Sequence, residues 1–276
     1  MSNTSLVHQL LNDLRSDDKQ KQRYALFRLS QLREPTALPA LLEALKHRDR
    51  EIRVLVVQAL AALGDPLAVP ALIDRLNDRS KDVRRAAAQA LGVIGDSTAL
   101  PGLVGALLGD GNSFVRWEAA KALQAIEDSA AVPELVEALA ADENSFVRYA
   151  AAEALGVLGD TSVLDALETA LLNDESDYVR YAAAVSLGQL GDPSSVPALL
   201  LALNHHSSHV WHAAAESVWQ MDEDAVPYIS DALLDEDGSV RRAALKAVLW
   251  LSVEFDSDDV AAEIDQDWYG MWGWWN

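Results

Sequence analysis

The sequence predicts an all-α fold, a right-handed solenoid of about eight stacked helix pairs. An apolar residue followed by arginine recurs every 30 to 32 residues, and alanine and leucine at helical spacing follow most copies. Half of the 276 residues are hydrophobic and only nine are proline, a composition that suits helices. A single helix pair cannot bury its apolar face alone, so units repeated in this way must stack on one another.

The repeats align on this two-residue anchor. Six copies have the full apolar–Arg form: Ile52-Arg53, Val83-Arg84, Val115-Arg116, Val147-Arg148, Val179-Arg180 and Val240-Arg241. Val210-Trp211 fills one missing register, and Gln22-Arg23 is a degenerate first copy. Residues 1–251 are therefore predicted to form one continuous stack, with 252–276 as a separate segment. The predicted repeats are approximately 5–33, 37–63, 67–94, 98–126, 130–158, 161–190, 194–221 and 224–251.

Each repeat is predicted to hold two helices. The second begins just before the anchor and ends at a glycine that can adopt a left-handed conformation, namely Gly64, Gly95, Gly159 and Gly191. The aspartate after each glycine is predicted to be a helix cap: Asp65, Asp96, Asp160 and Asp192. The first helix has proline in its first turn, where a missing N–H costs little. These prolines are Pro39, Pro70, Pro101, Pro133, Pro197 and Pro227.

The recurring pattern resembles a known family. The segments VRRAAAQALGVIGDSTALP (83–101) and VRYAAAEALGVLGDTSVLD (147–165) resemble the HEAT-like repeat named after phycobilisome lyases, and the resemblance covers roughly residues 20–250. It implies a HEAT-type α-solenoid whose second helices line the inner, concave side. It also implies two kinds of function, handling of bilins on phycobiliproteins and adaptor binding of other proteins.

Charge and composition narrow the class of partner. The chain has 43 acidic and 22 basic residues and a net charge of −21, so we expect it to repel nucleic acid and anionic membranes. There is no cysteine, no signal-like segment and no apolar run long enough to span a membrane. These features predict a cytoplasmic protein without membrane insertion.

A strip of rings and carboxylates is predicted on the second helices. The residue after each anchor, together with positions one and two turns further along, should look out from the inner side. This aromatic strip consists of Trp117, Tyr149, Glu153, Tyr181, His212, Glu216 and Trp219. Gly156 and Gly188 are expected to leave room beside the rings. The strip is predicted to bind a protein partner or stack on a planar ligand; the alternative is that the rings only pack against the next repeat.

Two other recurrent positions are assigned to structure. Phe114, Phe146, Tyr178 and His209 precede the anchor valines and are predicted to pack between adjacent helix starts. Arg53, Arg84, Arg116, Arg148 and Arg180 are expected to form a ladder. In repeats that resemble these, the arginine bonds acidic or backbone groups of the neighbouring unit.

Four of the six histidines lie close together in the sequence. His205, His209 and His212 have spacings that could present imidazoles to one metal if the segment is helical. A histidine-rich surface turn is the preferred interpretation, so no metal is expected. Known catalytic motifs are absent, and no catalytic residue is assigned.

The segment 252–276 is acidic and then aromatic. Its last nine residues, WYGMWGWWN, include Trp268, Tyr269, Trp272, Trp274 and Trp275. We expect this segment to cap the last repeat, and the alternative is a docking peptide for a partner.

The sequence thus favours a protein-binding scaffold or adaptor without a cofactor. Its partner could be a phycobiliprotein subunit or a second HEAT-like protein. The alternative is a bilin lyase subunit or chaperone with a bilin as transient ligand, whose activity would need a partner subunit. A metalloenzyme using the histidine cluster is a more remote alternative.

Overall fold

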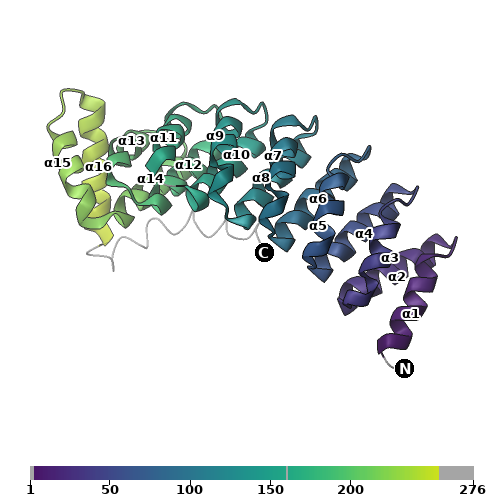
Figure 1. Ribbon diagram of the computed structural model, residues 1–276. Helices are drawn as coiled ribbons and strands as arrows, with labels where there is room; N and C mark the ends of the chain where they lie inside the picture. The colour runs from purple at the N-terminus through teal and green to yellow at the C-terminus, as the bar shows by residue number, and fades with distance from the viewer. Residues whose placement is uncertain (1–2, 160, 255–276) are drawn as a thin grey trace. The chain divides into compact units, whose positions relative to one another are not determined.

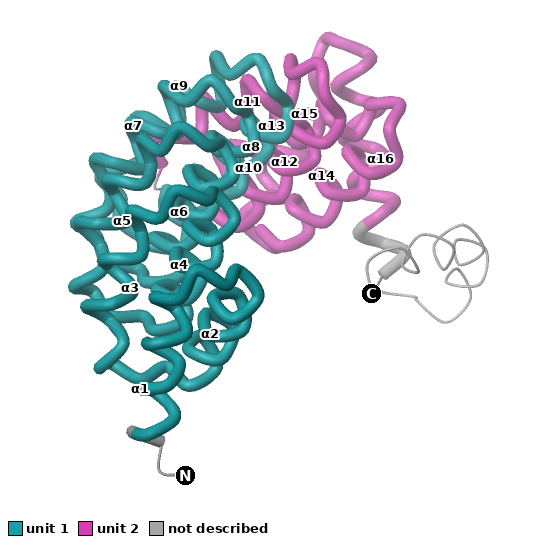
Figure 2. Tube along the Cα trace, turned by 90° about the vertical axis from the view of Figure 1, so that its right-hand side faces the viewer, with its two compact units in different colours: residues 1–159 teal, residues 160–276 magenta. Residues whose placement is uncertain are grey.

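The computed structural model describes residues 3–159 and 161–254 and divides into two compact units, residues 1–159 and 160–276 (Figure 2). The described residues form sixteen α-helices and seven short 3₁₀ turns and contain no strand. The prediction of an all-α solenoid of eight helix pairs is confirmed. Its right-handedness and the single continuous stack over residues 1–251 remain predictions.

Unit 1 contains five helix pairs (Figure 1). These are α1 (Asn3–Leu14) with α2 (Lys19–Leu32), α3 (Leu38–Ala44) with α4 (Arg50–Leu63), α5 (Val69–Arg75) with α6 (Lys81–Ile94), α7 (Leu100–Gly109) with α8 (Ser113–Ile126), and α9 (Val132–Ala141) with α10 (Ser145–Leu158). The second helices α2, α4, α6, α8 and α10 pack successively against one another. They therefore form one layer of the unit.

Unit 2 contains three pairs. They are α11 (Leu164–Asn173) with α12 (Asp177–Leu190), α13 (Val196–Ala202) with α14 (Ser208–Gln220), and α15 (Val226–Leu233) with α16 (Gly238–Glu254). The second helix α12 packs on α14, and α14 packs on α16. Buried alanine, valine and leucine side chains of both helix layers form the core of each unit.

The starts of the helices follow the sequence rules. Each predicted proline lies at the first or second position of its α-helix. Asp65, Asp96 and Asp192 cap the 3₁₀ turns that precede α5, α7 and α13, each by accepting a hydrogen bond from the backbone N–H two residues later. Asp160 lies outside the described residues.

The ends of the second helices match the prediction at three of four glycines. Gly64, Gly95 and Gly191 have φ of 71°, 74° and 64°, a left-handed conformation in which a side chain would be strained. The prediction for Gly159 is wrong, because φ is −77° and ψ is 162° there. The chain leaves α10 in an extended conformation, which any residue can adopt.

Candidate partner-binding site

A ladder of arginine side chains fixes the second helices of unit 1. Nε and Nη2 of Arg53 donate to the two carboxylate oxygens of Asp78 at 2.9 and 2.8 Å. The same two-point contact joins Arg84 to Asp110 and Arg116 to Asp142. Each aspartate also accepts a hydrogen bond from the backbone N–H two residues later, which holds the turn before the next second helix. The predicted structural role of the ladder is confirmed for these three arginines.

Arg148 donates to the Asp142 carbonyl, as Arg84 and Arg116 do to the carbonyls of Asp78 and Asp110. Arg180 differs, because it donates to the carbonyls of Asp174, Leu171 and Leu172 in its own repeat, so the predicted bond to the neighbouring unit is wrong for this arginine. In the repeat after Arg180, the turn position that holds the ladder aspartate elsewhere is His205. A neutral imidazole cannot supply the paired acceptors of a carboxylate, which explains the change of partner.

Unit 1 contributes three members of the aromatic strip. On α8, the half-buried ring of Trp117 has the Lys121 ammonium 4.8 Å from its centroid. On α10, the Tyr149 hydroxyl donates a 2.7 Å hydrogen bond to Oε1 of Glu153, and both side chains are half-buried. Each ring therefore has a polar partner one helical turn away that restricts its orientation.

A half-buried carboxyl, that of Glu118, lies next to Trp117 in the sequence. Burial raises the pKa of Glu118, and the positive charges of Arg85 and Lys121 oppose this only in part. The carboxyl therefore holds its proton to a higher pH than an exposed glutamate.

Unit 2 contains the other four members. Tyr181 and Trp219 are 39% and 45% exposed, and Glu216 is exposed. His212 is half-buried, with its ring stacked on Trp211 at 3.7 Å between centroids, and both rings meet the Trp250 ring edge-on. Burial, followed by the nearby charge of His209, lowers the pKa of His212.

Trp211 and Trp250 were missed by the sequence analysis. Trp211 stands where the other repeats have a ladder arginine, and this difference in the sequence could have identified it as a special position. Trp250 is on α16, so its contact with Trp211 required the tertiary structure.

The predicted space beside the rings is not present. Gly156 and Gly188 are buried, and a Cβ on Gly188 would lie 2.5 Å from Oγ of Ser217 on α14. The expectation that these glycines leave room for a ligand is therefore wrong. Gly188 instead allows α12 and α14 to approach closely.

The aromatic residues before the anchor valines are on the surface. Phe114, Phe146 and Tyr178 are 60%, 63% and 70% exposed, and His209 is also exposed. The prediction that they pack between helix starts is wrong. In these four helices, α8, α10, α12 and α14, the buried face begins at the anchor valine itself, and the preceding side chain is exposed to solvent.

The histidine cluster has a different composition from the predicted one. Within the described chain, the set of three metal-capable side chains is Asp177, His205 and His206, whose ligand atoms lie within 4.8 Å of one another. His209 and His212 do not belong to it.

The Nδ1 atom of His205 accepts a 3.2 Å hydrogen bond from the Ser207 N–H, as Asp78 accepts from Ser80 in an earlier turn. An unprotonated Nδ1 places the proton of the neutral ring on Nε2, the atom that faces Asp177 at 3.8 Å. This tautomer fits a turn-stabilising histidine better than a metal ligand. The predicted tail residues, Trp268 to Trp275, lie outside the described residues.

Comparison with known proteins places the chain in a family. HEAT repeats match residues 7–92, 69–156 and 164–250, so the chain belongs to the HEAT-repeat family. The HEAT-like repeat of phycobilisome (PBS) lyases matches residues 147–173. No curated protein matches. None of the described helices has the length and apolar character needed to cross a membrane.

Solved structures share the fold at low sequence identity. The YibA protein of Escherichia coli is 20% identical with a TM-score of 0.58, over 91% of this chain and 97% of that one. An engineered protein is 24% identical with a TM-score of 0.53, over 89% and 78%. The complex of CpcE and CpcF of phycocyanin lyase from Nostoc sp. PCC7120 is 24% identical with a TM-score of 0.49, over 89% and 93%. The first two of these similarities, with TM-scores above 0.5, concern the fold.

Proposed function

We propose that this protein is a scaffold that binds another protein through the aromatic strip on its second helices. The observation that carries the proposal is the repetition on α8 and α10. Each helix holds one partly exposed ring beside a polar partner, Trp117 with Lys121 and Tyr149 with Glu153. Oriented aromatic side chains contribute much of the binding energy in protein interfaces, because they bury a large area at a small entropic cost.

The HEAT-repeat architecture supports this function. Stacked helix pairs present an extended surface of repeated side chains, which suits recognition of a protein surface. Charged groups beside the rings add specificity, since Glu153 can accept hydrogen bonds from arginine or lysine of the partner. The proposal needs no cofactor.

The test is co-purification with the tagged full-length protein from its native host. The test variant is Trp117→Ala/Tyr149→Ala, and the matched control is Phe114→Ala/Phe146→Ala, which removes exposed rings from the same two helices. We expect a partner that survives the control and is lost with the test variant. If the partner is lost only with the control variant, the interface lies at the starts of α8 and α10 around Phe114 and Phe146, and the proposal is contradicted.

A second candidate function is the handling of a bilin together with a phycobiliprotein. It is favoured by the match of the phycobilisome-lyase HEAT-like repeat to residues 147–173, a segment that includes Tyr149 and Glu153. A carboxylate beside a ring could accept hydrogen bonds from tetrapyrrole N–H groups while the ring stacks on the pigment. The phycobiliprotein subunit or a second HEAT-like protein would then be the protein partner.

The bilin function predicts a pigment signal. Free bilin mixed with the full-length protein should show a shifted visible absorption band and induced circular dichroism, both reduced by Glu153→Gln. A scaffold without this function gives neither signal but keeps its protein partner. The two measurements therefore separate the candidates.

A further inference from the structure

Unit 1 has a basic cavity at the turns that begin α4 and α6. The cavity has a volume of about 470 Å³ and is lined by five cationic side-chain residues and one serine: Arg48, Arg50, Arg53, Arg79, Lys81 and Ser80. This concentration of positive charge contrasts with the net charge of −21 for the whole chain.

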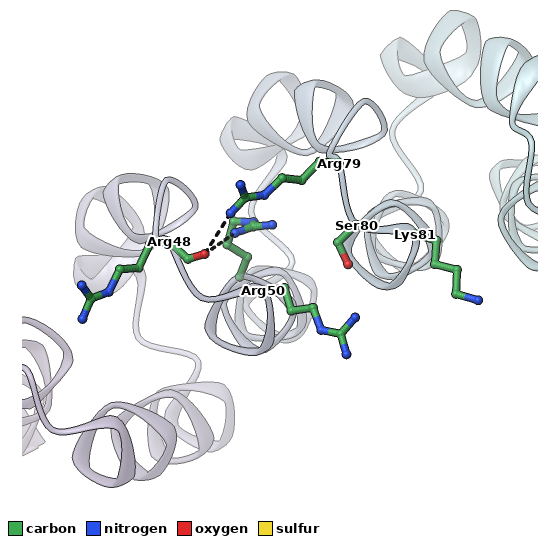
Figure 3. A pocket seen from close by; sticks show the side chains of 6 residues that line it. Arg48, Arg50, Arg79, Ser80 and Lys81 are labelled. Atoms are coloured by element: carbon green, nitrogen blue, oxygen red, sulfur yellow. Dashed lines mark hydrogen bonds between the residues drawn. The ribbon is translucent and has the colours of Figure 1, made fainter.

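Hydrogen bonds hold part of the cavity wall in place. The carbonyl oxygen of Arg48 accepts from Nη1 of Arg53 at 3.1 Å and from Nη2 of Arg79 at 3.2 Å. Figure 3 shows that the Arg48 side chain points away from its own carbonyl oxygen, whereas the Arg79 side chain extends from the next turn toward that oxygen. Arg79 keeps donors beyond its bond to the Arg48 carbonyl, and Arg50 and Lys81 extend from the starts of α4 and α6, so these three side chains are the ones that can bind a ligand.

Neighbouring carboxylates neutralise only part of this charge. The buried Asp78 neutralises Arg53, which leaves four of the five cations. Asp82 lies 3.4 Å from Arg50 in an exposed ion pair, which contributes little and is readily exchanged. Asp49 and Glu51 are both engaged by Lys19.

The repeats provide an internal comparison that shows the fold does not require these cations. Two residues before the anchor, the first two full repeats have Arg50 and Lys81, whereas later repeats have Ser113, Ser145, Asp177, Ser208 and Gly238. Four residues before it, Arg48 and Arg79 give way to Gly111, Glu143, Glu175, His206 and Glu236. All these turns lead into a second helix, so the turn also forms with serine, glycine or glutamate at these positions.

Basic residues are also concentrated in the N-terminal part of the chain, where the cavity lies. Residues 1–100 contain 15 basic and 12 acidic residues, whereas residues 101–276 contain 7 basic and 31 acidic residues. Beyond a Debye length of about 8 Å at physiological salt, charges are largely screened, so a short anion near the cavity experiences mainly the local positive charge. A long polyanion such as nucleic acid would also meet the acidic remainder.

We propose that this cavity binds a short acidic segment of a partner protein, with carboxylates facing Arg50, Arg79 and Lys81. Guanidinium groups pair with carboxylates through two parallel hydrogen bonds, and the adjacent N-termini of α4 and α6 add positive potential. The site does not include Trp117 or Tyr149. It therefore goes beyond the proposed function and can be tested without knowing the partner of the aromatic strip.

The test measures binding of a short fluorescent peptide of alternating aspartate and serine to the full-length protein by anisotropy. The test variant is Arg50→Gln/Arg79→Gln/Lys81→Gln. The matched control is Arg15→Gln/Lys21→Gln/Arg28→Gln, which removes the same charge from α2 and the turn before it in the same unit. We expect about fivefold or greater weakening in the test variant, from the loss of three charge contacts, and little change in the control.

Two further probes define the ligand. The same peptide with asparagine in place of aspartate should not bind, because the cavity recognises negative charge. Equal weakening by both variants, or no binding to the wild-type protein, would overturn the proposal. Displacement of the peptide by inorganic phosphate below the Kd of the peptide would also overturn it, by assigning the cavity to phosphate groups.

Discussion

Replacing Arg53 with methionine should be among the most destabilising single changes in unit 1. The side chains of Arg53 and Asp78 are each 5% exposed and joined by two hydrogen bonds. Methionine fills much of the same volume but leaves the Asp78 carboxylate buried. Its remaining contacts are the Ser80 N–H at 2.9 Å and the Arg75 guanidinium at 3.8 Å.

The cost follows from the buried charge. Removing one partner of a buried ion pair typically costs about 3–5 kcal/mol, because the other charge has lost its solvation and its partner. We expect about 3 kcal/mol, the lower end, since Ser80 and Arg75 still stabilise the carboxylate. The equivalent change Arg84→Met should cost less, because the Arg84 side chain is 20% exposed and water can reach the site.

The assay is urea unfolding of the full-length variants followed by far-UV circular dichroism. The double variant Arg53→Met/Asp78→Leu should recover most of the lost stability, because it leaves no unpaired buried charge. A cost below about 1 kcal/mol for Arg53→Met, or a double variant as unstable as the single one, would refute the reasoning.

The same contact has a pH dependence. Burial alone would raise the pKa of Asp78, but hydrogen bonds from Arg53 and Ser80 outweigh it and lower the pKa below its usual value. The contribution of the ionised carboxylate is therefore complete above the unfolded-state pKa of about 3.9 and is lost as the pH falls through the lower folded value. In the variant Asp78→Asn, the free energy of unfolding measured between about pH 5 and pH 2 should therefore depend less on pH than in the wild-type protein.

Two further predictions concern helix contacts and titration. Gly92→Ala should destabilise the protein by about 1–3 kcal/mol, because the new Cβ would lie 2.8 Å from the Cα of Ala122. Gly105 has open space around it, so Gly105→Ala should be neutral or stabilising, and thermal unfolding of the two variants tests the difference. The pKa of His212 is lowered mainly by burial, so its neutral form is favoured in the folded state, and stability should fall as the pH drops below the unfolded value of about 6.5. His212→Gln should flatten urea-unfolding stability between about pH 7 and pH 5, and an unchanged profile would show that His212 does not contribute.

The sequence by itself determined the helices and most of their boundaries. Proline at the helix starts, glycine at three helix ends and aspartate at the caps act within a few residues of chain, so their effect can be read locally. Their repetition also predicted the eight pairs, because a single pair cannot bury its apolar face alone, and the resemblance to HEAT-like repeats implied the arginine ladder. Gly159 departs from the rule, because its own backbone is extended and not left-handed.

The tertiary structure decided which side chains of the predicted helices face solvent and which face another helix. Phe114 and Phe146 were predicted to pack against a neighbouring helix but are exposed to solvent. Gly188 was predicted to leave open space but is covered by Ser217. The contact of His212 with Trp250 joins residues of different repeats. The cations around Arg79 come from two different turns, and only the tertiary structure places them around one cavity. Burial and charge clustering depend on distances between helices, and the local pattern of one helix does not contain those distances.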